Sequence, residues 1–121
     1  MIAACILVAV LAFGASGDEI GDCAFEYARV PAAVTIPSGV GRIGIRAFFG
    51  CGELTTLTLS PGVRRIGRHA FAFCRGLKSV TIPEGVTEIG EGAFAGCSEL
   101  ETVTIPEGVT GIGARAFAGC H

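Results

Sequence analysis

One segment decides the fold: Leu77-Lys78-Ser79-Val80-Thr81-Ile82-Pro83-Glu84-Gly85-Val86-Thr87-Glu88-Ile89-Gly90-Glu91-Gly92-Ala93-Phe94-Ala95-Gly96-Cys97. Close copies of this segment follow one another along most of the 121-residue chain, as five equally spaced residues show: Phe25, Phe48, Phe71, Phe94 and Phe117. A repeat of this length is typical of a solenoid, because a single unit is too small to bury its own apolar side and must stack on its neighbours.

Each repeat contains the pattern of a short strand, in which apolar residues alternate with threonine. The predicted strands cover residues 34–36, 57–59, 80–82 and 103–105. Proline ends three of them, since it cannot donate a hydrogen bond to a neighbouring strand. An Ile-Gly pair follows in each repeat and predicts a second short strand. The few residues between this pair and the next cysteine leave room for one or two helical turns.

Stacked repeats place residues of the same type above one another, about 4.8 Å apart. We therefore expect columns of phenylalanine, leucine and isoleucine in the core. Cys51, Cys74, Cys97 and Cys120 recur in one phase, and we expect them to be buried thiols that act as small apolar groups. The turn glycines are expected to have positive φ; they are Gly39, Gly62, Gly85 and Gly108.

The shared pattern is Leu-x-x-Val-Thr-Ile-Pro-x-Gly-Val-x-x-Ile-Gly-x-x-Ala-Phe-x-x-Cys, and it resembles the BspA-like subclass of leucine-rich repeats. The match covers residues 34–121 well and is looser from Ile20, since Ala28 replaces the cysteine and Pro31 the leucine. The resemblance implies a right-handed, β-rich leucine-rich-repeat solenoid, with parallel strands on the concave side and short turns or helical turns on the convex side. It also implies a secreted or surface-displayed protein that takes part in adhesion or protein binding.

The chain divides into residues 1–17 and residues 18–121. The second part holds about four and a half repeats, the last of them incomplete at the C-terminal end. The first part contains an unbroken apolar run, Ile2 to Phe13, followed by small residues, which is typical of a signal peptide. Its phase also matches the strands, so a degenerate N-terminal capping coil is the alternative, and a cytoplasmic location would then follow. The run is too short for a transmembrane span.

Composition and motifs argue against several classes of function. The formal charge is −2 without a block of like charge, so we expect no nucleic-acid partner. Residues 39–44 match Gly-x-Gly-x-x-Gly, but a dinucleotide site would need a helix directly after the turn, and we expect no cofactor. His69 and His121 lack partners for catalysis, and the cysteines lack metal-ligand spacing. We expect no enzyme activity and no metal site; Cys5 and Cys23 stay unassigned.

The array that we interpret as functional lies on the strands. If alternate strand residues point inward, a two-column hydroxyl surface points outward. Its members are Thr35, Thr56, Thr58, Ser79, Thr81, Thr102 and Thr104. We predict that this face binds a protein or a glycan, although threonine is also simply a favourable strand residue. The alternative is a structural fragment of a longer array that has no ligand of its own and whose uncapped C-terminal coil permits end-to-end self-association. Ice binding is a third, remote option, since horseshoe curvature opposes a planar ice match.

Overall fold

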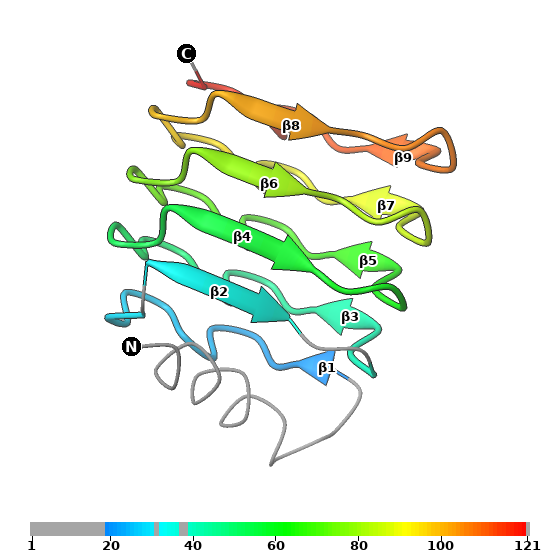
Figure 1. The fold of residues 1–121 in the computed structure, drawn as a ribbon, viewed down its shortest axis with the longest axis horizontal. Helices are drawn as coiled ribbons and strands as arrows, with labels where there is room; N and C mark the ends of the chain where they lie inside the picture. Colours follow the sequence, from blue (N-terminus) through cyan, green and yellow to red (C-terminus); the bar gives the residue numbers. More distant parts are fainter. Residues whose placement is uncertain (1–18, 31, 37–38, 121) are drawn as a thin grey trace.

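The computed structural model describes residues 19–30, 32–36 and 39–120, which form a stack of parallel-stranded coils (Figure 1). Each coil supplies strands to two separate sheets. The first sheet has the order β2-β4-β6-β8, with β2 at Ala33–Ile36, β4 at Thr56–Leu59, β6 at Ser79–Thr81 and β8 at Thr102–Thr104. The second has the order β1-β3-β5-β7-β9, with β1 at Glu19–Ile20, β3 at Arg42–Ile43, β5 at Arg65–Ile66, β7 at Glu88–Ile89 and β9 at Gly111–Ile112. The segment of residues 1–17, with its two interpretations, lies outside the described residues.

The register confirms that equivalent residues of successive coils lie above one another. Val34 pairs with Leu57, Leu57 with Val80 and Val80 with Val103. The inward residues of β2, β4 and β6 are buried, as the alternation of apolar residues and threonine predicts, while Val103 of β8 is partly buried. The second sheet confirms the predicted second strand, although each of its strands pairs the isoleucine with the residue before it, and the glycine follows the strand.

The segments between the second sheet and the cysteines form successive tight turns. We call residues 22–27, 45–50, 68–73, 91–96 and 114–119 the first to fifth turn segments. Within the second of them, the amides of Arg46, Phe48 and Gly50 donate to carbonyls of the next coil. The intervening amides close turns within their own coil. An α-helix needs every amide for bonds within the helix, so the described residues form no helix, and short turns are the correct alternative.

The phenylalanine column forms the centre of the core. Rings of successive coils stack with centroids 5.1 to 5.4 Å apart, from Phe25 through to Phe117. Phe48, Phe71 and Phe94 have no exposed surface. Parallel offset stacking of this kind adds to the hydrophobic gain of burying a large side chain.

The cysteine column is buried as expected at Cys51, Cys74 and Cys97 and partly buried at Cys120, but its thiols also have a polar role. Cys51, Cys74, Cys97 and Cys120 are free thiols. Each donates a hydrogen bond to the carbonyl of a phenylalanine one coil earlier, at 3.1 to 3.2 Å. Each of these carbonyls also accepts a backbone amide from its own coil, so the thiol adds a second hydrogen bond to it. Burial, with a smaller contribution from Cys120, raises the pKa of Cys97 to about 12.

The glycine prediction is correct in two repeats and wrong in two. Gly39 and Gly62 have φ of 102° and 112°. Gly85 and Gly108 lie outside the positive-φ region. In their turns the amide of the following valine closes onto the proline carbonyl, as Val86 does onto Pro83 at 3.2 Å. A type I turn of this kind needs no positive φ.

We expect Phe71→Ala to lower the free energy of unfolding by about 3–5 kcal/mol, because the cavity lies between two other rings. Phe117→Ala should cost clearly less, since Phe117 is only partly buried and stacks on one ring among the described residues. Urea denaturation of both variants measures the difference. Equal losses would contradict the role of the ring column.

Stability should also fall at high pH because of Cys97. The pKa of Cys97 in the folded state lies above the ordinary value of 9.0. Its contribution to the free energy of unfolding is therefore complete below pH 9.0 and is lost as the pH rises toward about 12. The unfolded chain then releases a proton that the folded chain keeps. Urea denaturation from neutral pH upward should therefore show a shallower decline for Cys97→Ala than for the wild type. Parallel declines would show that this thiol has the same pKa in both states.

Candidate functional site

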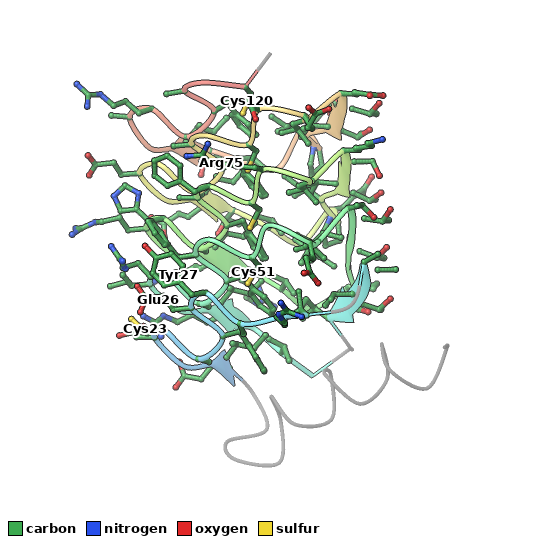
Figure 2. All side chains as sticks on the ribbon, turned by 90° about the vertical axis from the view of Figure 1, so that its left-hand side faces the viewer. Cys23, Glu26, Tyr27, Cys51, Arg75 and Cys120 are labelled. Atoms are coloured by element: carbon green, nitrogen blue, oxygen red, sulfur yellow. The ribbon has the colours of Figure 1, made fainter. Side chains whose placement is uncertain are left out.

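The sequence-predicted hydroxyl face forms one continuous surface over the first sheet. The pairings Thr56–Ser79–Thr102 and Thr35–Thr58–Thr81–Thr104 align two columns along the stack. Six of the seven predicted residues are exposed and Ser79 is partly so. Figure 2 shows a row of oxygen-tipped side chains pointing away from this sheet, on the right-hand edge of the view. The structure therefore brings all seven residues together, and we call this surface the strand face.

The hydroxyls of the strand face form no hydrogen bond with another described residue. Other threonines of the chain differ in this respect: the hydroxyl of Thr55 donates to Ala32 O at 3.0 Å and that of Thr87 to Arg64 O at 3.3 Å. Those two hydroxyls serve contacts between coils. The hydroxyls of the strand face remain available to a partner or to water, because each can both donate and accept.

The second sheet exposes charges that largely pair with each other. Arg42 contacts Glu19 at 2.8 Å, and Arg65 contacts Glu88 at 3.1 Å. These side chains are about half exposed, so each pair contributes between 0 and about 1 kcal/mol. This sheet therefore presents compensated charge, unlike the uncharged strand face.

The turn segments present an aromatic cluster that our reading of the repeat missed. It consists of Tyr27, Phe49 and Phe73, and it lies on a different side of the stack from the strand face. Phe49 contacts Tyr27 and Phe73 edge to face, with centroids 5.5 and 5.4 Å apart. Tyr27 is 68% exposed and Phe73 42%. Figure 2 shows Tyr27 near Cys23 and Glu26 on the side opposite the first sheet.

Two arginines lie over rings of this cluster. The guanidinium of Arg46 is 3.9 Å from the centre of the Phe49 ring, and that of Arg75 is 5.7 Å from the centre of the Phe73 ring. Arg46 also donates to Glu26 at 2.7 Å, and this bond raises the pKa of its guanidinium. Cation–π contacts of this kind hold the side chains in place on an exposed surface.

A signal for the cluster was present in the sequence. Tyr27 and Phe73 occupy the position that Gly50, Gly96 and Gly119 hold in the other turn segments, and all five have positive φ. A side chain in this conformation costs roughly 1 kcal/mol or more. An aromatic residue in a glycine position is thus a departure from the repeat that the sequence already shows.

Of the two histidines that the sequence contains, the structure describes His69. His69 lies with its ring against Gly92, where an added Cβ would be 2.4 Å from Nδ1. Its Nδ1 is enclosed and makes no hydrogen bond in the described part of the chain. No group of three or more metal-ligating side chains occurs there. Nor does any helix in those ranges have the length and apolarity to cross a membrane.

Comparisons with known proteins agree with this geometry. The family model of the BspA type leucine rich repeat region matches residues 5–121 in six copies. A leucine rich repeat protein of T. pallidum (TpLRR) is 36% identical, with a TM-score of 0.82 over 85% of this chain and 48% of that one. A leucine rich cell surface protein of Faecalibacterium prausnitzii is 32% identical, with a TM-score of 0.51 over 85% of this chain and 40% of that one. The chain thus spans less than half the length of either protein. A comparison with curated protein sequences finds no match.

Proposed function

The chain belongs to the BspA-type leucine-rich repeat family, and from that premise we propose a non-enzymatic interaction scaffold of the adhesion type, which binds a protein or a glycan through the strand face. The observation that carries this proposal is the absence of hydrogen bonds between the strand-face hydroxyls and other described residues. Seven hydroxyls in two aligned columns offer donors and acceptors at a regular spacing of about 4.8 Å.

The rigidity of the stack supports binding by this face. Pairing on both sides fixes each inner strand, and the buried residues beneath it lock its orientation. A surface that is already ordered loses little conformational entropy when a partner binds. The near absence of charge on the face suits an uncharged polar partner, such as a neutral glycan or a hydroxyl-rich protein surface.

The location that we propose is outside the cell, either secreted or on the cell surface. A structural neighbour with 32% identity is named a cell surface protein, which supports this location by similarity. The free thiols buried in the core do not oppose it, since they are enclosed by the stack.

A second candidate function is coil stacking, and the last described coil favours it. Ile105 is 41% exposed and Ile112 51%, whereas the equivalent Ile82 and Ile89 are buried beneath that coil. An apolar surface of this kind would accept a further coil, either from a longer array or from a second copy. The chain would then contribute length to an assembly and bind no ligand of its own.

To test the strand face, we expect the double variant Thr58→Ala/Thr81→Ala to lose binding to whole cells or to arrayed glycans that retain the wild type. Stability should fall by less than about 1 kcal/mol per substitution, because both side chains are exposed. Thr110→Ala is the matched control, since this exposed threonine lies outside the strand face. Retained binding by the double variant would contradict the proposal.

To test coil stacking, sedimentation equilibrium should show wild-type self-association that rises with concentration. Ile112→Glu should abolish it, because the added charge would be buried between coils. Ile45→Glu changes an exposed isoleucine away from this end and should leave association unchanged. A wild type that stays monomeric up to its solubility limit would exclude the self-association of this chain.

A further inference from the structure

The residues at the end of each turn segment and directly after it differ in size from coil to coil. The first turn segment ends in Tyr27-Ala28-Arg29 and the third in Phe73-Cys74-Arg75, while the second, between them, ends in Gly50-Cys51-Gly52. An aromatic residue and an arginine are therefore present on both sides of two glycines. The result is a notch in the turn side of the stack.

Packing requires a glycine at one of the two notch positions but not at the other. Gly50 is required by packing, because an added Cβ would lie 2.6 Å from the Tyr27 ring. Gly52 is not: an added Cβ there would meet no atom within 4 Å, and its φ is not in the left-handed region. Packing would thus admit a side chain at position 52, as the neighbouring coils have. Its absence leaves the notch open.

The notch has the dimensions and the walls of a binding site. Its volume is about 380 Å³, and its lining consists of Tyr27, Phe49, Gly50, Gly52, Phe73 and Arg75. Volumes of this size are within the range of known ligand sites. The aromatic walls are held by edge-to-face contacts with Phe49, so they are ordered before any ligand arrives.

The charge at the notch is uncompensated. Arg42, Arg46, Arg65 and Arg68 each contact a carboxylate. Arg75 and Arg29 form no ion pair with any residue in the described ranges. A free guanidinium binds carboxylates in a bidentate geometry. The positive charge beside exposed rings thus selects an acidic ligand with an apolar ring.

We propose that this notch is a second binding site, which takes an acidic, aromatic-containing segment of a protein partner. A carboxylate of the segment pairs with Arg75, and an aromatic ring packs between Tyr27 and Phe73. Tyrosine and arginine are enriched among the residues that contribute most of the binding energy at protein interfaces. Gly52, which has open space where a Cβ would stand, lets an extended backbone approach closely. Arg29 and Arg75 lie two coils apart, about 10 Å, which three residues of an extended chain span. These features favour a peptide over an acidic glycan.

The site is independent of the strand face. The two surfaces lie on different sides of the stack, so a partner can occupy one while the other is free or filled. The scaffold would then join two different molecules, which goes beyond the single-face function proposed above.

Nuclear magnetic resonance titration of the full chain tests the notch directly. The probe is a capped heptapeptide of alternating glutamate and phenylalanine. We expect it to shift the amide signals of Gly50 and Gly52 and to leave those of Thr58 and Thr81 unchanged. Matched peptides with lysine for glutamate, or alanine for phenylalanine, should bind at least about tenfold more weakly.

Two matched variants separate the notch from the rest of the surface. Gly52→Leu fills the notch in open space and should weaken peptide binding about tenfold or more, with an unchanged melting temperature. Ser98→Leu places the same side chain at the equivalent position two coils away, next to Gly96-Cys97, and should bind as the wild type does. Arg75→Glu should also abolish binding. Thr58→Ala/Thr81→Ala should retain it, so failure of the strand-face function would leave this result intact.

Several outcomes would overturn the proposal. The lysine peptide could bind as tightly as the acidic one, or Gly52→Leu could bind the acidic peptide as well as Ser98→Leu does. Absence of any shift at Gly50 and Gly52 with the acidic peptide would do the same. Displacement of the peptide by a galacturonate oligosaccharide that binds more tightly would assign the notch to acidic glycans.

Discussion

The hydrogen-bonded spacing between parallel coils is the constraint on which this structure depends. Backbone pairing places each coil about 4.8 Å above the last, and both the strands and the turn segments obey it. A flat aromatic ring, a thiol or a β-branched side chain can repeat at this distance. A buried charge would meet a like charge in the next coil, and the core accordingly contains no buried polar or charged residue among those described. The composition of the core thus follows from its geometry.

The same spacing explains why glycine recurs beside the second sheet. At Gly67 an added Cβ would lie 2.7 Å from Gly44 C, and at Gly90 it would lie 2.7 Å from Arg68 N. No side chain fits between coils there. The turn segments meet the opposite requirement, since their amides must reach the next coil and cannot close a helix. Both features come from the separation of the coils rather than from the local preference of the sequence.

Much of the fold could be predicted because the same residues recur at the same positions in several repeats. The strand positions, the parallel register, the phenylalanine column and the exposed strand face all follow from residues that recur in phase. Features that depend on a single turn could not be read in the same way. Gly39 and Gly85 share a phase and each follows a proline by two residues, yet only Gly39 has positive φ. The position of the proline therefore does not determine the turn type. The thiol hydrogen bonds were hidden for another reason, since a pattern of cysteines does not show which carbonyl each one faces.

The aromatic cluster consists of residues that depart from the repeat, and such residues indicate function. A residue that obeys the repeat is explained by stacking alone, because each coil needs it to pack on the next. Tyr27 and Phe73 break the repeat, adopt a backbone conformation that disfavours side chains, and still expose much of their rings. Each ring packs on the glycine of the next coil, but other coils have glycine at this position. Stacking therefore does not require an aromatic residue there, whereas a ligand that needs an aromatic wall does. Gly52 is the opposite case, since it has no side chain although the space around it would admit one. Departures of both kinds meet at one notch, and that coincidence is the strongest argument that this side of the scaffold has a partner of its own.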